Sequence, residues 1–436
     1  MSAVRSWTGL PRVRHARVLD LGGRNDPLPP LRDAETMVAH GAGRSYGDVA
    51  LNPDGVALRT RRLKHFIAFD PATGRLACEA GVTLGEILDL VAPQGWFLPV
   101  VPGTRFATLG GAIANDVHGK NHHVAGTFGH HVTRFELLRS DGERLVCSPN
   151  ENPDWFSATL GGLGLTGVVT WAELALARIP NPFMLTQARR FDTLDGFWAL
   201  NARAEADWPY TVAWVDCLAR SGRGVLFTGR HAPPRADLPA WRERRRAMPV
   251  TPPVSLVNRL SLRLFNEAYH RRPRPDGARL VHHVPFFFPL DAIGNWNRIY
   301  GPRGFHQYQC VVPRDAGPDA IAAMLGHIAR ERQGSFLAVL KTFGSRPSPG
   351  MLSFARPGVT LALDFPDKGA ATERLFARLD AVVAEAGGAL YPAKDGRMSA
   401  ALFRSGYPNW ETFARFVDPR FMSGFWRRVG SGPCTS

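Results

Sequence analysis

The residues whose types and spacing could do chemistry are concentrated in Gly103–His123, GTRFATLGGAIANDVHGKNHH. The small residues Gly110, Gly111 and Ala112 let backbone N–H groups approach a ligand closely. They are followed by a cluster of titratable side chains, namely His118, Lys120, His122 and His123. Titratable groups beside such a run indicate chemistry on a bound molecule, although a glycine-rich loop with solvated histidines would show the same pattern.

A second set of polar residues falls on expected strands of the C-terminal half. Gln307 and Gln309 are two residues apart, so both side chains point to one face of their strand. Lys341 lies in the next strand among apolar residues, and Lys394 follows a short strand. If these four side chains meet on one sheet face, they form a polar pocket for a hydroxyl-rich or anionic ligand. The alternative is that the lysines extend to water.

The segment His40–Asp48, HGAGRSYGD, has the composition of a diphosphate site. Its glycines expose backbone N–H groups around Arg44, and such groups bind anions. The segment is not a G-x-G-x-x-G fingerprint and no long helix is expected after it, which argues against a Rossmann-type NAD site. The sequence also lacks the P-loop, H-E-x-x-H and G-x-S-x-G patterns.

The elements that must position these residues differ between the two halves of the chain. In the first half, residues 38–60 are expected as two short strands around a glycine turn, and residues 65–79 and 134–147 as hairpins. A capping box at Thr83 and Glu86 predicts a helix over Thr83–Ala92. Gly103–His123 is expected in the loop after that helix. A boundary is expected at residues 178–182, RIPNP.

From Gln307 onward, strand and helix patterns follow the order β-α-β-β-α-β. Helices are expected over Asp319–Arg332 and Thr372–Ala386, and strands over 307–312, 336–343, 359–365 and 389–391. This order is typical of a ferredoxin-like layer, in which an antiparallel sheet carries helices on one face. The predicted fold class is therefore α+β.

Length and composition limit the functional classes. The chain has 436 residues, enough for two or three domains, and a formal net charge of +15. A basic surface attracts nucleic acid, anionic membranes or phosphorylated ligands, and charge alone does not choose among them. No apolar run approaches the roughly 20 residues that span a bilayer, and the N-terminus lacks a secretory signal, so a cytoplasmic location is expected. Five scattered cysteines without C-x-x-C spacing predict buried reduced thiols rather than a zinc site or disulfides.

Five sequence blocks, in order along the chain, carry a resemblance to a known family. They are GAGRSYGD, VPGTRFATLGGAIANDVHGKNHH, LGGLGLTG, NWNRIYGPRGFHQYQ and YPAKDGR. Together they resemble the decaprenylphosphoryl-β-D-ribose 2′-oxidase family, within the vanillyl-alcohol-oxidase (PCMH-type) FAD superfamily. The resemblance implies a two-subdomain FAD-binding domain at 1–177, a substrate-binding cap domain at 178–388, and a C-terminal segment, 389–436, that returns to the FAD domain.

The resemblance also implies that FAD is held by the glycine-rich segments, with Gly161–Gly167 closing the cofactor site. The implied FAD contacts are Gly41, Ala42, Gly43, Arg44, Ser45, Tyr46, Gly47, Gly103, Thr104, Thr108, Gly110, Gly111, Ala112, Asn115, His118, Gly119, Gly162, Gly167 and Lys394. Superfamily members that bind flavin covalently in this loop have a histidine where this chain has Arg44. Non-covalent FAD is therefore expected.

The implied reaction oxidises the 2′-hydroxyl of a polyprenyl-phosphoryl ribofuranose to the 2′-keto sugar, the first half of an epimerisation to the arabinose form. Hydride passes to flavin N5 while a base takes the hydroxyl proton. The implied catalytic residues are Lys394, Tyr46, His118 and Lys120, with either Tyr46 or His118 as the proton acceptor or its relay. The implied substrate-binding residues are Gln307, Gln309, Lys341, Thr360 and Ala362. No metal is implied.

The partners implied are the polyprenyl-phosphoryl sugar and a separate NAD(P)H-dependent reductase that acts on the keto product. The basic, proline-rich segment Pro239–Gly277 would be a mobile flap that contacts the inner face of the membrane, or else a disordered basic loop. The rival activity is that of an alditol or aldonolactone oxidase of the same superfamily. Nucleic-acid binding rests only on the charge, because arginine is spread through the chain and no recognition motif is present.

Three features depart from the family pattern. Leu19–Val38 is short and carries Pro27, Pro29 and Pro30, where many relatives have a helix. Some members have a cysteine at the position of Ala362, and Asn115 also replaces a family cysteine. Inhibitors that bond covalently to the cysteine at the position of Ala362 are therefore not expected to react with this chain.

Overall fold

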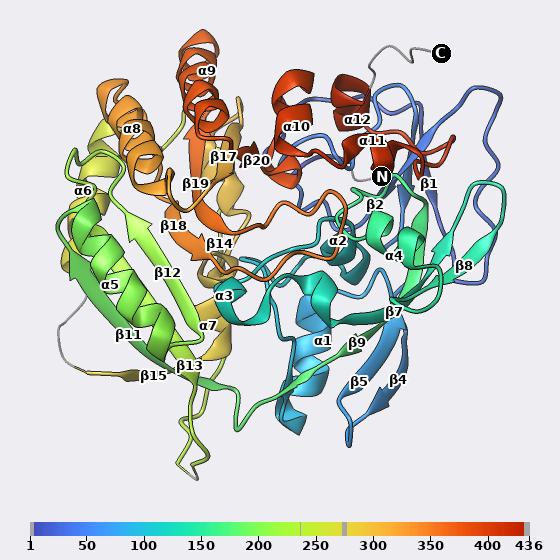
Figure 1. The fold of residues 1–436 in the computed structure, drawn as a ribbon, viewed down its shortest axis with the longest axis horizontal. Helices are drawn as coiled ribbons and strands as arrows, with labels where there is room; N and C mark the ends of the chain where they lie inside the picture. Colours follow the sequence, from blue (N-terminus) through green and yellow to red (C-terminus); the bar gives the residue numbers. More distant parts are fainter. Residues whose placement is uncertain (1–3, 236, 273–276, 431–436) are drawn as a thin grey trace.

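The computed structural model describes residues 4–235, 237–272 and 277–430. Figure 1 shows the N-terminal strands, in blue and cyan, on one side of the molecule and a large sheet with its helices on the other. The C-terminal helices, in red, lie over the N-terminal side. The chain therefore crosses to the large sheet once and then returns.

Two sheets form most of the N-terminal side. A parallel sheet has the order β1 (Arg17–Asp20), β3 (Val56–Arg59), β2 (Met37–His40). A five-stranded antiparallel sheet has the order β4 (Phe66–Asp70), β5 (Arg75–Glu79), β9 (Val168–Ala175), β7 (Val132–Leu138), β8 (Arg144–Cys147). The predicted hairpins β4–β5 and β7–β8 are confirmed. A short pair, β6 (Trp96–Phe97) with β10 (Ala177–Arg178), lies beside them.

The helix predicted from the Thr83–Glu86 capping box is confirmed as α1 (Leu84–Val91), because both hydrogen bonds of the box are present. The prediction that Gly103–His123 lies in a loop is wrong. It contains two short helices, α2 (Leu109–Ala114) and α3 (His122–Ala125). Thr108 begins α2, since its hydroxyl accepts a hydrogen bond from Gly111 N (3.1 Å). Glycines in the first turn of a helix hide it from propensity-based prediction.

The large sheet has eight strands. Their order is β15 (Arg279–His282), β11 (Phe183–Phe191), β13 (Gly224–His231), β12 (Tyr210–Val215), β18 (Ala338–Phe343), β19 (Gly358–Pro366), β17 (Phe305–Val312), β20 (Ala389–Leu390). One face is covered by α5 (Leu194–Asp207), α8 (Gly317–Arg330) and α9 (Ala370–Glu385) (Figure 1). The C-terminal part of this sheet is built in the order β17–α8–β18–β19–α9–β20. Thr342 faces the covering helices, where Asn201 Nδ2 donates to its hydroxyl (3.0 Å), so Lys341 faces the other way.

The segment Pro239–Gly277 includes a well-formed helix, α6 (Arg259–Arg271), with Leu262, Asn266 and His270 buried. The alternative of a disordered loop is therefore wrong for Arg259–Arg271, whereas residues 239–258 are mostly irregular and leave it open there; residues 273–276 lie outside the described residues. The neighbouring elements are α7 (His283–Phe287) and the strand pair β14 (Arg246–Ala247) with β16 (Ile293–Gly294).

The C-terminal residues begin in the large sheet and end on the N-terminal side. β20 pairs with β17, so residues 389–390 belong to the sheet rather than to the returning segment. The return passes through α10 (Ala400–Gly406), α11 (Trp410–Ala414) and α12 (Gly424–Val429). Phe421 packs in the core of the parallel sheet, and Met422 N donates to Met37 O (2.8 Å). The remaining helices are α4 (Pro153–Thr159) and the 3-10 helices η1 (Ala92–Gln94), η2 (Phe128–His131), η3 (Pro289–Ala292), η4 (Trp296–Tyr300) and η5 (Pro392–Lys394).

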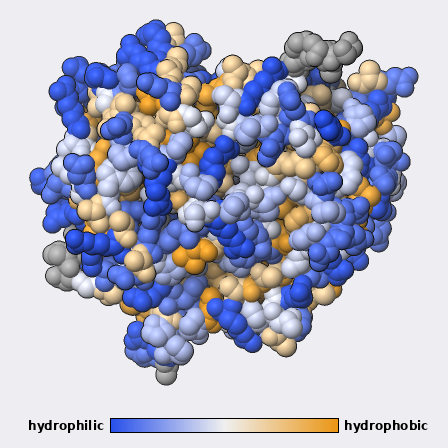
Figure 2. All heavy atoms as spheres, viewed as in Figure 1, coloured by the Kyte–Doolittle hydropathy of each residue, from blue (hydrophilic) through white to orange (hydrophobic). Residues whose placement is uncertain are grey.

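Several composition-based expectations can be compared with this fold. The described cysteines, Cys78, Cys147, Cys217 and Cys310, are buried free thiols, whereas Cys434 lies outside the described residues. Within 4–430, gaps aside, no group of three or more His, Cys, Asp or Glu residues is placed to hold a metal ion. No helix among the described residues has the length and apolarity to cross a bilayer. Figure 2 shows a mainly hydrophilic face with small hydrophobic groups.

Candidate active site

A cavity of about 830 Å³ lies between the glycine-rich segments and the uncovered face of the large sheet. It is lined by every predicted site residue except Ala112 and Gly162. Ala112 belongs to α2 and faces the core instead of the cavity. Gly162 instead allows a close approach of backbone, since an added Cβ would lie 2.2 Å from Ala158 O. The fold thus brings together predicted site residues that are spread along the chain from Gly41 to Lys394.

The sheet contributes a row of cross-strand pairs to this cavity. Lys341 lies opposite Thr360, Gln309 opposite Ala362, and Gln307 opposite Asp364. Side chains two residues apart on a strand share a face, so all six belong to one face, and all but Asp364 line the cavity. Five of the six were predicted; Asp364 was missed, although its spacing from Ala362 was a usable signal.

His118 lies at the centre of the cavity wall. Gln309 Nε2 donates a hydrogen bond to His118 Nε2 (3.2 Å) and another to Thr360 Oγ1 (3.3 Å). The imidazole packs against the rings of Phe343 and Tyr391, with centroids 4.9 and 5.4 Å away. Burial, reinforced by the charges of neighbouring cations, holds the pKa of His118 well below its usual value. His118 is therefore neutral near pH 7.

The lysines of the site are held by backbone carbonyls. Lys341 Nζ donates to Gly119 O (2.9 Å), and Lys120 Nζ donates to Phe287 O (2.9 Å). Lys341 is only 8% exposed, so the alternative that its side chain extends to water is wrong. Burial lowers the pKa of Lys120 to about 8 and, with the charges of Lys120 and Lys394, lowers that of Lys341 to about 7.

Lys394 and Tyr46 meet where the glycine-rich loop of residues 41–47 touches η5. The ammonium group of Lys394 lies 3.6 Å from the centroid of the Tyr46 ring, and Tyr46 N donates to Ala393 O (2.9 Å). Burial and the nearby charge of Asp364 raise the pKa of Tyr46 well above its usual value. Tyr46 therefore stays protonated near neutral pH.

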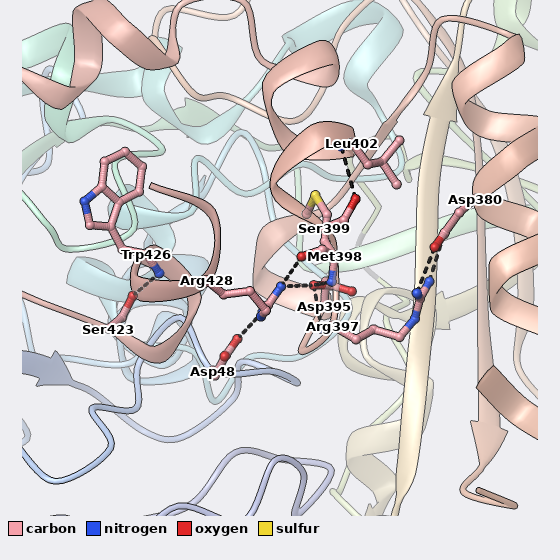
Figure 3. Close-up of polar contacts among 10 residues, drawn as sticks. All are labelled: Asp48, Asp380, Asp395, Arg397, Met398, Ser399, Leu402, Ser423, Trp426 and Arg428. Atoms are coloured by element: carbon pink, nitrogen blue, oxygen red, sulfur yellow. Dashed lines mark hydrogen bonds and ion pairs between the residues drawn. The ribbon is translucent and has the colours of Figure 1, made fainter. Parts of the chain in front are cut away.

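A polar network fixes the residue next to Lys394 (Figure 3). Arg428 from α12 bridges two carboxylates, Asp48 at 2.8 Å and Asp395 at 3.3 Å. Asp395 Oδ2 also accepts hydrogen bonds from Met398 N (2.6 Å) and Arg397 N (2.9 Å). Since Asp48 follows the glycine-rich loop and Asp395 follows η5, one arginine holds together the two segments that carry Tyr46 and Lys394.

The remaining histidines of the opening segment support the fold. His122 Nδ1 accepts a hydrogen bond from Gly344 N (3.1 Å), and His123 Nε2 lies 3.1 Å from Trp208 O, to which it donates. Both contacts tie α3 to the large sheet and its helices. Burial lowers the pKa of His122 to about 3, so it stays neutral.

The glycine-rich walls of the cavity fit a dinucleotide. An added Cβ at Gly41 would lie 2.6 Å from Thr108 Oγ1, so this position favours glycine, and at Gly110 it would lie 3.1 Å from Ala80 Cβ, a tight contact. Some buried polar atoms here have no partner among the described residues, namely Arg44 Nε, Asn115 Oδ1 and His118 Nδ1. Because buried polar groups normally form hydrogen bonds, these atoms are candidates to bind a polar ligand.

Comparisons with known proteins agree with this arrangement. The FAD binding domain family matches residues 32–148. Decaprenylphosphoryl-beta-D-ribose oxidase of Mycolicibacterium smegmatis is 35% identical over 90% of this chain and 89% of its own length. An uncharacterized protein of Streptomyces coelicolor is 35% identical over 80% of this chain and 100% of its own length. A putative D-arabinono-1,4-lactone oxidase of Neurospora crassa is 29% identical over 35% of this chain and 27% of its own length.

The chain belongs to the decaprenylphosphoryl-β-D-ribose oxidase family. It is an FAD-dependent oxidoreductase. The residues that would hold FAD are those of the glycine-rich walls, with Arg44 between the rings of Trp7 and Phe106 at 4.2 and 5.0 Å. Trp7 was missed from the sequence because it precedes the first family block.

The half of the cavity farther from the glycine-rich loops was also missed. It is lined by apolar and aromatic side chains from separate elements, namely Val212, Trp214, Phe227, Tyr269, Phe286 and Val339. Tyr269 of α6 packs over Trp214, with ring centroids 4.8 Å apart. The same sheet face is thus polar over β17 and β19 and apolar over β12 and β13. No local pattern predicts this, because each strand contributes only one or two of these residues.

Proposed function

We propose that this family member oxidises the 2′-hydroxyl of a polyprenyl-phosphoryl ribofuranose to the 2′-keto sugar. The observation that carries the proposal is a cavity with a polar row at one end and an apolar groove at the other. Such a cavity suits a sugar attached to a prenyl chain, as the name of the Mycolicibacterium relative also implies. FAD, when bound, accepts the hydride from the sugar carbon.

Side chains that line the cavity carry the remaining roles in the reaction. We assign the role of proton acceptor to His118, whose depressed pKa keeps it neutral before the reaction. Its basic nitrogen is Nε2, which must exchange the hydrogen bond from Gln309 for one from the sugar hydroxyl. Tyr46, whose raised pKa keeps it protonated, donates a hydrogen bond to the sugar in this proposal, and His118 is the proton acceptor. Lys394 and Lys341 supply positive charge beside the reacting oxygen, and Lys120 holds the loop of His118 against α7.

The apolar groove takes the first prenyl units of the substrate. Arg272 and Arg279 line the same part of the cavity and would neutralise the phosphate. A separate NAD(P)H-dependent reductase would then consume the keto sugar and complete the epimerisation. A free alditol or aldonolactone, the substrate class of the rival activity, would leave the apolar groove without a partner.

The outer side of α6 is suited to contact a membrane. Leu260 and Leu264 are 68% and 65% exposed, and Val250, Val254 and Leu256 beside them are also exposed. Arg259 lies close to Arg263 and Arg332, whose charges lower its pKa. Apolar side chains among clustered cations match the surface of an anionic bilayer, where polyprenyl phosphates reside. The enzyme would then act at the inner face of the membrane.

Anaerobic mixing tests the reaction. A short-chain polyprenyl-phosphoryl ribofuranose should bleach the flavin absorbance of the FAD-loaded enzyme, and Lys394→Ala should abolish bleaching while leaving the fold intact. Bleaching by a free alditol or aldonolactone, with none by the lipid-linked ribose, would support the rival activity.

Vesicle sedimentation tests the membrane contact. The enzyme should bind phosphatidylglycerol vesicles more strongly than phosphatidylcholine vesicles, and Leu260→Ser/Leu264→Ser should weaken binding. Val124→Ser removes an apolar side chain of similar exposure, 59%, from α3 and is the control. Equal binding by both variants would contradict a contact through α6.

A further inference from the structure

Asp116 is a fully buried carboxylate two residues before His118, and the proposed reaction gives it no role. Both of its oxygens are paired: Gly129 N donates to Oδ1 (2.7 Å) and Ser353 Oγ donates to Oδ2 (2.5 Å). Burying a carboxylate is costly unless it is hydrogen-bonded, so these two bonds hold its partners firmly in place. Asp116 thereby joins the end of α2 to η2 and to the segment between β18 and β19.

The backbone at Asp116 turns the chain from α2 toward the cavity. Its φ of +36° is left-handed, a conformation that Asp and Asn tolerate better than most other residues with a side chain. After this turn His118 pairs with Thr127 in an isolated antiparallel bridge. The bond from Gly129 N to the Asp116 side chain extends that contact by a further link. Asp116 therefore fixes the backbone from which the imidazole projects.

Ser353 connects Asp116 to the rings that surround His118. The next residue, Phe354, has its ring centroid 5.6 Å from that of the imidazole. The Phe354 ring also stacks on Tyr391, with centroids 4.5 Å apart and an interplanar angle of 16°. Because Phe354 follows Ser353 directly, the bond from Ser353 to Asp116 limits how far this ring can move from the imidazole.

Tyr391 is tied to the same loop by a bond of its own. Its hydroxyl donates to Asn115 O (3.1 Å), the carbonyl of the residue before Asp116. The two stacked rings are thus held to two adjacent residues at the end of α2. Between them, His118 Nε2 accepts a hydrogen bond from Gln309 Nε2 (3.2 Å), which selects the neutral tautomer with its proton on Nδ1.

We propose that Asp116 is a positioning residue for His118: through Gly129 and Ser353 it holds the loop and the rings that fix the orientation of the imidazole. It acts through these contacts and does not line the cavity itself. The proposal rests on the proposed function only for the role of His118 as proton acceptor, because the orientation of the ring can be measured without substrate.

Two substitutions at Asp116 test the hydrogen bonds. Asp116→Ala removes both of them. Asp116→Asn keeps an oxygen that accepts from the backbone N–H, gains an NH2 group that can donate to the serine hydroxyl, and tolerates the left-handed turn. The matched control is Asp418→Ala, because Asp418 is also buried, accepts hydrogen bonds from two backbone N–H groups (2.9 Å each) and does not line the cavity.

Nuclear magnetic resonance provides the first measurement. Long-range ¹H–¹⁵N spectra of the FAD-loaded protein with ¹⁵N-labelled histidine show which ring nitrogen carries the proton, and the signal lost in His118→Gln identifies the ring. We expect the Nδ1–H tautomer in wild type, Asp116→Asn and Asp418→Ala, and averaging of the two tautomers in Asp116→Ala. An unchanged single tautomer in Asp116→Ala would overturn the proposal. If thermal unfolding shows that Asp116→Ala does not fold, Ser353→Ala, which removes one of the two bonds, takes its place with the same expectation.

Kinetics provide the second measurement. Flavin reduction by the lipid-linked ribose should slow by about 10- to 100-fold in Asp116→Ala with little change in KM, since a misplaced base affects the chemical step more than binding. Asp116→Asn should restore the rate. An equal loss in Asp418→Ala would assign the effect to general destabilisation and overturn the proposal. If the tautomers respond as expected but the ribose does not reduce even the wild-type enzyme, the proposed function fails and the positioning role stands.

Discussion

Replacement of Arg428 by methionine should destabilise the protein and loosen its active site. Arg428 bridges Asp48 and Asp395, whose side chains are each only 8% exposed. Its loss leaves two like charges buried without their common partner. Breaking a buried ion pair costs about 3–5 kcal/mol. Because the Arg428 side chain is 25% exposed, water screens part of the interaction, and we expect about 2–4 kcal/mol.

The effect of this substitution should depend on pH. Burial raises the pKa of Asp48, and Arg428 opposes that shift. Without Arg428 the folded-state pKa rises further, so the charged carboxylate becomes an increasing penalty as pH rises through the acidic range. The destabilisation should therefore be smaller at mildly acidic pH, where Asp48 takes up a proton, than at neutral pH.

Urea unfolding of the FAD-free protein, followed by circular dichroism, measures the free energy of unfolding. Hydrogen exchange should show faster opening of residues 41–48 and 392–399 together, since Arg428 joins them. Arg415→Met, an exposed arginine in the same C-terminal region, is the matched control. The reasoning fails if Arg428→Met loses less than about 0.5 kcal/mol, the ordinary range of surface substitutions.

Three further predictions concern the cavity. Gly47→Ala should prevent FAD binding, because the added Cβ would lie 1.6 Å from Asp395 O. The control Gly103→Ala should bind FAD normally, since nothing lies within 4 Å of its added Cβ. Flavin fluorescence titration distinguishes the two variants. Acid precipitation should leave FAD in the supernatant, because Arg44 cannot form the flavin bond that a histidine makes, and a yellow pellet would contradict this. The rate of flavin reduction by the substrate should fall as pH increases through about 7, where Lys341 loses the charge that it would place beside the reacting oxygen, and a flat profile in wild type would refute that role.

Local signals in the sequence predicted local structure well. The Thr83–Glu86 capping box and the β4–β5 and β7–β8 hairpins depend on residues close in sequence, and all three are present. The segment around Thr108 was mispredicted as a loop because two glycines follow in the first turn of α2, where a hydroxyl cap compensates for their low helix propensity.

Long-range contacts could not be predicted in this way. Arg428 and Asp48 are 380 positions apart, and nothing near either residue indicates the other. Asp364 lies two residues beyond Ala362 in a strand that was predicted, yet its hydrogen bond with Gln307 depends on the register with β17, which no single-strand pattern contains. The alternation of Gln307 and Gln309 was sufficient to place them on one face, but not to show which residues lie opposite.

The charge balance of the cavity explains why such contacts matter. Neither Lys120 nor Lys341 forms an ion pair in the part of the chain that the structure describes; each is held by a backbone carbonyl. Burial lowers the pKa of both lysines, and the charges of Lys120 and Lys394 lower that of Lys341 further. Anionic groups in the cavity would reverse both effects, since an opposite charge favours protonation. The free protein therefore bears an electrostatic cost that a diphosphate or a sugar phosphate relieves, and this is the physical basis on which the basic cavity selects phosphorylated molecules over neutral sugars.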